Sequence, residues 1–243
     1  MQKQFCPKHQ SNQNQIKNMK VTFLLSASIF ALFSNFAQAQ SAANTTPTSE
    51  IRFLPKKVAP DKTPGSQYFN ETFVPAKIGN SNEIVLVRHN AYTDEIEVNI
   101  DNAIKIVPSD ISLPVRLTNS PISYEYVEYT TEKGTRKEGY LKAISNNQKI
   151  KIYKSESIYR KPEVDPDSGY GTYKPAAYTK LKDEYFIKMG DADIKPLPLK
   201  KKSIIAILPE KEKEIAAFIK DNDLSISEEA SLVMLGRYIN SLM

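Results

Sequence analysis

The feature that most constrains this chain is a succession of short alternating segments joined by tight turns, with no helical pattern between them. Residues 95–100 alternate strictly, so their isoleucine and valine side chains share one face of a half-buried strand. Asp101 and Asn102 form a turn pair, and the alternation resumes after them, so residues 95–107 predict a hairpin. Strands connected in this way run antiparallel, which favours an antiparallel β meander.

Further segments extend the same pattern. The run Ile84–Val87 is β-branched and is expected to be buried on both faces. The other predicted strands cover residues 122–130, 136–144, 149–153, 177–182 and 184–188, with a long proline- and glycine-rich loop at 160–176.

The C-terminal end has a helical pattern instead. Short helices are expected at 203–208 and from Pro209 to about 221. The sequence at 225–228, Ser-Ile-Ser-Glu, is a capping box that should open a last helix. One stripe of this helix is expected to pack on the sheet, and it consists of Leu232, Leu235, Ile239 and Leu242. The predicted fold class is therefore α+β, an antiparallel β meander or sheet followed by two or three C-terminal helices.

The N-terminal region predicts export. An apolar core follows Lys17 and Lys20, and small residues precede a cut between Ala39 and Gln40, which is the pattern of a cleavable signal peptide. We expect a signal peptide at 1–39, with Met19 as an alternative start, and no transmembrane span in the mature chain. Residues 40–63 read as a flexible lead whose apolar patch at 51–54 is a docking point or an edge strand. Residues 64–243 form the single predicted domain, β-rich over 64–199 and helical over 200–243.

Removal of the leader changes the charge argument. The formal net charge is +5, but residues 1–39 contain four lysines and no acid, so the mature chain carries about +1. A basic surface for nucleic acid is therefore not expected, and no nucleic-acid partner is predicted. The only cysteine, Cys6, is removed with the leader, so the mature chain forms no disulfide.

The catalytic and metal-binding patterns are weak. His89 is the only histidine of the mature chain, and we interpret it as a surface residue at a strand end, without a nucleophile elbow nearby. Structural zinc needs more Cys or His ligands than remain. Asp165 and Asp167 before Gly169 resemble the opening of a calcium loop, but the later ligands are missing, so we interpret it as a surface loop. No catalytic residue, cofactor or metal is predicted.

Acidic residues leave one enzymatic alternative open. Glycoside hydrolysis requires two carboxylates at a defined separation, and candidate acids occur in several segments. They are Asp94, Glu95, Glu97, Asp183, Glu184, Asp191 and Asp193. The absence of tryptophan counts against a cleft that stacks sugars.

Tyrosines on the predicted strands give the one candidate ligand site. Tyr124, Tyr126, Tyr140 and Tyr153 lie on neighbouring strands and could line a groove for a peptide or ligand. Packed rings with their hydroxyl groups in water explain the same pattern.

Three stretches of the chain carry a family resemblance. They are PGSQYFNE at 64–71, VRHNAYTDEIEV at 87–98, and a tail that contains KDEYFIK at 182–188, Leu208-Pro209 and YINSL at 238–242. Together they resemble a family of uncharacterised exported proteins of Bacteroidota-type bacteria. The resemblance implies a periplasmic or outer-membrane-facing setting, and it carries no activity and no functional residues. The family often has tyrosine at the position of His89.

These observations favour a non-enzymatic binding or accessory protein of the cell envelope, exported to the periplasm or associated with the outer membrane. Its expected partner is an envelope protein or peptide. The alternative is a carboxylate-dependent hydrolase that acts on an envelope polymer.

Overall fold

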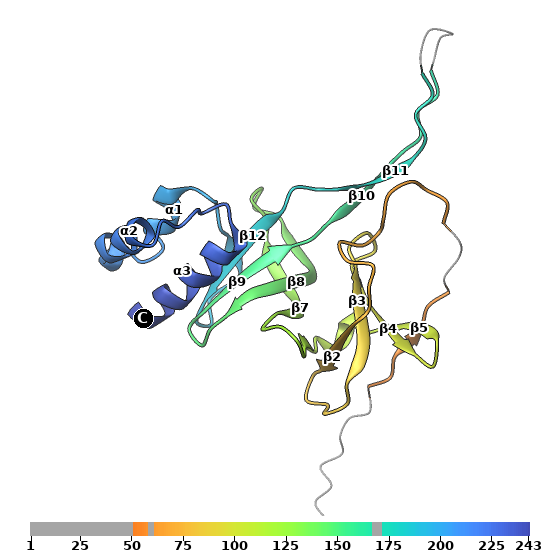
Figure 1. Ribbon diagram of the computed structural model, residues 1–243, viewed down its shortest axis with the longest axis horizontal. Coiled ribbons are helices and arrows are strands. Elements are labelled where there is room, and N and C mark those ends of the chain that lie inside the picture. The colour runs from red at the N-terminus through yellow and green to blue at the C-terminus, as the bar shows by residue number, and fades with distance from the viewer. Residues whose placement is uncertain (1–50, 58–60, 167–171) are drawn as a thin grey trace, which may run out of the picture. The chain divides into compact units, whose positions relative to one another are not determined.

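The computed structural model describes residues 51–57, 61–166 and 172–243. The predicted signal peptide and its cleavage site at Ala39 and Gln40 lie outside these residues, as does most of the predicted calcium-loop fragment. The described part contains a large antiparallel sheet followed by C-terminal helices (Figure 1), which confirms the predicted α+β class.

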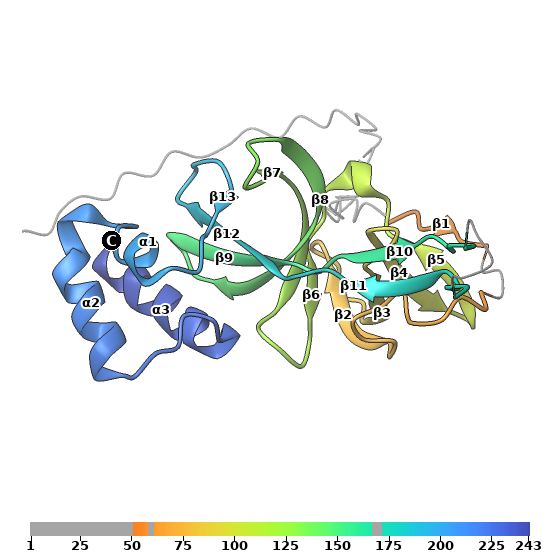
Figure 2. The ribbon, with the colours of Figure 1, turned by 90° about the horizontal axis from the view of Figure 1, so that it is seen from above.

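The main sheet has eleven strands in the order β1-β5-β4-β3-β2-β6-β7-β8-β9-β12-β13, and all the paired strands are antiparallel. The strands are β1 (Leu54–Pro55), β2 (Val74–Ile78), β3 (Val85–Asn90), β4 (Glu95–Ile100), β5 (Ala103–Ile106), β6 (Val115–Leu117), β7 (Ser123–Thr130), β8 (Arg136–Asn146), β9 (Ile150–Ser155), β12 (Glu184–Met189) and β13 (Lys195–Pro196). A separate two-stranded sheet pairs β10 (Ile158–Lys161) with β11 (Ala177–Lys180) (Figure 2).

The predicted hairpin at 95–107 is confirmed. β4 pairs with β5 through Ile100 opposite Ala103. Asp101 and Asn102 both have positive φ, 53° and 62°, as a turn that follows the strand twist requires. The strand at 54–55 pairs with β5 at the sheet edge, so this part of the lead joins the sheet.

The sheet departs from a simple meander at β6. After β5 the chain passes through a 3₁₀ turn at Ser109–Ile111 and returns beside β2, so that β2 lies between β3 and β6. β2 contains Pro75 and β6 has only three residues, which is why neither stands out in the sequence.

The helices are α1 (Lys201–Ile205), α2 (Glu212–Asp221) and α3 (Glu229–Leu242), with a 3₁₀ turn at Pro209–Lys211 before α2. α3 contacts β8 and β9, and the three helices lie together at that end of the sheet (Figures 1 and 2). The predicted stripe is confirmed as core, because Leu232, Leu235 and Ile239 are buried and Leu242 packs against the same cluster.

Gly236 marks the closest approach of α3 to the sheet. A Cβ atom at this position would lie 2.5 Å from the hydroxyl oxygen of Ser145 and 3.1 Å from the Cδ1 atom of Ile152. The missing side chain therefore allows the helix to sit directly on β8 and β9.

The predicted capping box is wrong. α3 begins at Glu229, with Glu228 in the capping position and no side-chain cap hydrogen bond. The hydroxyl group of Ser225 instead lies 3.0 Å from that of Ser227, inside a turn that precedes the helix. The motif lies one turn before the helix, and Ser225 and Ser227 form a hydrogen bond with each other rather than with the free N–H groups of α3.

The core is divided among three clusters. One joins the helices to β8, β9 and β12, another lies under β2, β3, β4 and β6, and a third contains Leu141, Tyr153 and Phe186. Within the described ranges, the helices are all too short or too polar to cross a membrane.

Candidate functional site: a cationic pocket on β2, β3 and β6

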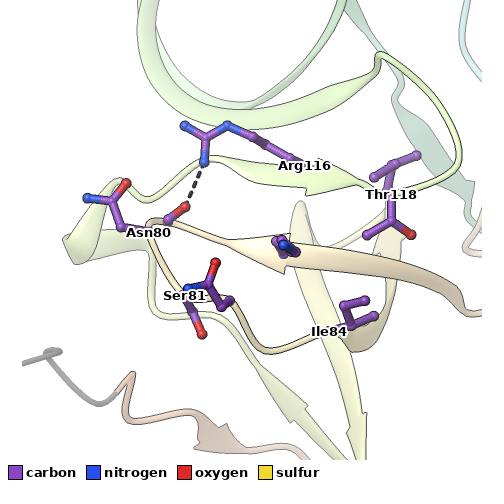
Figure 3. Close-up of a pocket in the computed structure, with 9 residues that line it drawn as sticks. Asn80, Ser81, Ile84, Arg116 and Thr118 are labelled. Carbon is purple, nitrogen blue, oxygen red and sulfur yellow. Dashed lines mark hydrogen bonds between the residues drawn. The ribbon is translucent and has the colours of Figure 1, made fainter.

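A pocket of about 610 Å³ opens on the outer face of β2 and β6, at the turn between β2 and β3 (Figure 3). Its residues come from the end of β2, the turn at 79–84 and β6. They are Lys77, Gly79, Asn80, Ser81, Asn82, Ile84, Arg116, Leu117 and Thr118. Two of the nine are cations, four are amide or hydroxyl residues, and none is an acid or an aromatic residue.

Strand alternation points the two cations away from the core. Ala76 and Ile78 of β2 and Val115 of β6 are buried in the cluster beneath these strands. Lys77 and Arg116 have the opposite parity, so they face the outer surface. They are also directly opposite each other in the register of β2 and β6.

The turn fixes the position of the arginine. Gly79 has a φ of +58°, which favours glycine, and its N–H donates to the carbonyl of Pro114 at 2.9 Å. The carbonyl of Gly79 accepts a hydrogen bond from Nη1 of Arg116 at 2.6 Å. Figure 3 shows Arg116 reaching from β6 toward the turn that carries Asn80 and Ser81. The guanidinium is thus anchored through one nitrogen, and its other donors remain for a ligand.

The charge balance of Lys77 and Arg116 is unusual among the opposed cation pairs of the described strands. Like charges directly opposite on adjacent strands destabilise a sheet. One pair of acids, Glu128 and Glu138, is directly opposite in the described strands, and Glu128 forms an ion pair with Arg136. Two other pairs of cations are directly opposite, Lys142 with Lys154 and Lys151 with Lys188. In the first, each lysine has an acidic partner, and in the second Lys151 is paired with Glu125. Neither Lys77 nor Arg116 forms an ion pair with any carboxylate in the part of the chain that the structure describes.

The apolar run beside this pocket is less buried than its sequence predicts. The prediction that Ile84–Val87 is buried on both faces is wrong, because Ile84 is 57% exposed and Leu86 is 44% exposed. Only Val85 and Val87 face the core, where they belong to the cluster under β2 and β3. The chain therefore leaves two large aliphatic side chains in solvent on the face that carries the cations.

A second cleft, of about 450 Å³, surrounds Glu97 at the other end of β3. The Glu97 side chain is fully buried although its strand was expected to expose one face. Lys56 donates to Oε1 of Glu97 and Arg88 donates to Oε2, both at 2.7 Å. The Tyr68 hydroxyl and the Asn90 amide also donate to this carboxylate, at 3.0 and 3.2 Å.

This network keeps Glu97 ionised. Burial acts to raise the pKa of Glu97, but hydrogen bonds from Lys56, Arg88 and Asn90 outweigh it and hold the pKa below its usual range. In the same cleft the Tyr178 hydroxyl, which donates at 2.6 Å, lowers the pKa of Asp61. Neither carboxyl group is therefore tuned to donate a proton near neutral pH, and the cleft is a satisfied polar network rather than an acid–base pair.

The four tyrosines predicted as a groove fall into two core clusters. Tyr126 and Tyr140 meet edge to face with centroids 5.2 Å apart, and Tyr124 packs in the same cluster. Tyr153 belongs to the other cluster, and its hydroxyl donates to Glu125 at 2.8 Å. Burial, followed by a neighbouring carboxylate, raises the pKa of the hydroxyl groups of Tyr124, Tyr140 and Tyr153. None of the four lines either pocket described above.

His89 is not the surface residue that the sequence indicated. Only 6% of it is exposed, and its Nε2 atom lies 3.1 Å from a carboxylate oxygen of Asp94. The ring packs against Tyr124 and Tyr140. The other oxygen of Asp94 accepts the backbone N–H of Tyr140 at 3.1 Å, so the turn after β3 is attached to β8. The sequence placed His89 at a strand end, but the contact with β8 needs the tertiary fold.

Sequence reasoning missed the cationic pocket. The sequence feature that could indicate it is a single cation between apolar residues in each of two short segments, VPAKI and VRL. The chemistry arises only when the register places Lys77 against Arg116. Comparison with protein-family models, curated proteins and solved structures gave no match to this chain.

Proposed function

We propose that this chain is an exported, non-enzymatic binding protein of the cell envelope and that its cationic pocket holds an anionic group. The observation that carries the proposal is Lys77 directly opposite Arg116 with no described carboxylate to neutralise them. A bound anion would relieve the repulsion between the two cations and so stabilise the folded protein. Unfavourable local arrangements, such as two opposed cations, are expected mainly at functional sites.

The two cations suit different parts of one anion. Arg116 presents a planar fork that matches the oxygens of a carboxylate or phosphate, whereas Lys77 is a point charge. Charge-assisted hydrogen bonds of this kind are about twice as strong as neutral ones. The neutral side chains of Asn80, Ser81 and Thr118 add donors and acceptors at the rim. The pocket can therefore bind an anion without a metal or a reacting group.

The hydrolase alternative has less support. A general acid for glycoside cleavage needs a raised pKa. Glu97 and Asp61, which both line the second cleft, have lowered pKa values instead, and Glu97 is fully engaged by its own neighbours. The setting in the cell envelope rests on the signal-peptide pattern of residues 19–39 and on the family resemblance.

The test is titration calorimetry of the mature protein with inorganic phosphate and with acetate at low ionic strength. Wild type should bind at least one of them, and Lys77→Gln and Arg116→Gln should each weaken binding about tenfold or more. Lys133→Gln is the matched control, because Lys133 is an exposed lysine in the turn between β7 and β8. The proposal is wrong if wild type binds neither anion, or if Lys77→Gln binds as wild type does.

A further inference from the structure

We infer that the anion is the C-terminal carboxylate of a peptide whose last side chains are apolar. This inference rests on the proposed function and adds the class of ligand. It draws on the pocket, on the aliphatic side chains beside it, and on the neutral polar groups between them.

The aliphatic side chains lie where the end of a peptide would pass. Ile84 lines the pocket itself, together with both cations. Leu86 lies two residues further along β3 on the same face, opposite Pro75 of β2. Two residues of a strand span about 7 Å, which is also the repeat of an extended peptide. One or two apolar side chains before a bound carboxylate can therefore cover Ile84 and Leu86.

The neutral polar side chains distinguish a peptide from a simpler anion. Asn80, Asn82 and Thr118 line the pocket and offer both donors and acceptors. A peptide presents backbone N–H and C=O groups next to its carboxylate, and these groups need such partners when they leave water. A fatty acid has an apolar chain at that place, and inorganic phosphate has nothing beyond its own oxygens.

The occupant also fits the sheet around the pocket. β2 and β3 are both interior strands of the sheet, so a ligand on this face cannot add a strand and must be held by side chains. The lining residues include no aromatic ring on which a sugar could stack. Capture of a terminal carboxylate, with specificity from the adjoining side chains, is a known mode of peptide recognition.

The experiment uses two pools of random acetylated tetrapeptides, one with a free C-terminal carboxylate and one with a C-terminal amide. Each pool is equilibrated with the mature protein, and the retained peptides are identified by mass spectrometry. We expect retention from the carboxylate pool alone, enrichment of leucine, isoleucine and valine at the last two positions, and displacement by whichever of phosphate and acetate the protein binds. Lys77→Gln should reduce retention about tenfold or more. Leu86→Ser should keep carboxylate binding but lose the apolar preference, while Lys133→Gln should behave as wild type.

Several outcomes would overturn the inference. Equal retention of the amidated pool would show that the carboxylate is not the bound group. Tight binding of decanoate with no retained peptide would indicate a fatty acid, and an unchanged preference in Leu86→Ser would remove the apolar site. If phosphate or acetate binds but no peptide is retained, the inference fails and the proposed function stands. If phosphate and acetate do not bind either, both fail.

Discussion

Replacement of Glu97 by glutamine should be the most damaging single polar change in the sheet. The side chain of Glu97 is fully buried, whereas its partners Lys56 and Arg88 are 19% and 17% exposed. Removing one member of a buried ion pair costs about 3–5 kcal/mol, because a charge remains without its partner. Lys56 keeps Glu95, and both cations reach some water, so we expect Glu97→Gln to lower the free energy of unfolding by about 3 kcal/mol.

Urea denaturation of the mature protein measures this loss. Glu95→Gln is the matched control, because Glu95 shares Lys56 but is 33% exposed, and it should cost less than about 1 kcal/mol. The pKa of Glu97 is lowered on folding, so its contribution is complete above the ordinary value of 4.5 and is lost as the pH falls through the folded pKa. The gap between Glu97→Gln and wild type should therefore close in acid. Equal stabilities at about pH 7, or a gap that widens below the ordinary pKa, would refute the reasoning.

Two further predictions concern the helix and the leader. Leu235→Ala should lower the free energy of unfolding by about 2–5 kcal/mol, since Leu235 is buried between α3 and the sheet. A Leu235→Ala variant that urea denaturation shows to be as stable as wild type would contradict this. Ser225→Ala should change it by less than about 0.5 kcal/mol, because Ser225 does not cap α3. Ala39→Phe should block cleavage before Gln40. An uncut leader found by N-terminal sequencing of the exported wild-type protein would contradict this prediction.

The elements that the sequence predicted best are those whose pattern is local. The hairpin at 95–107 and the stripe of α3 depend on alternation, on a turn pair and on helical spacing, all of which a single segment carries. β2 and β6 were missed because a proline and short length hide their alternation. The capping box failed for the opposite reason, since Ser225 has the right chemistry but finds a closer partner in Ser227.

The burial of polar residues and the candidate site cannot be predicted from neighbouring residues in the sequence alone. Glu97 occupies the outward parity of its strand, and it is buried only because Lys56 and Tyr68 are brought over that face from an earlier part of the chain. Ile84 and Leu86 are of residue types that usually lie in the core, yet nothing in the described chain covers them. The pairing of Lys77 with Arg116 depends on the register between β2 and β6, which are separated in the sequence by three other strands, and the contact from Arg116 to Gly79 depends on it too.

The central claim is that the structure accepts an uncompensated pair of cations in order to bind an anion. The most direct measurement is the free energy of unfolding of ligand-free Lys77→Gln and wild type at low ionic strength, in buffer without phosphate or carboxylate. The account predicts that Lys77→Gln is more stable than wild type by about 0.2–1 kcal/mol. The difference should shrink in about 1 M sodium chloride, where such charges are screened, and added phosphate should stabilise wild type more than the variant. A Lys77→Gln protein that is no more stable than wild type at low salt, while Lys133→Gln is unchanged, would contradict the account.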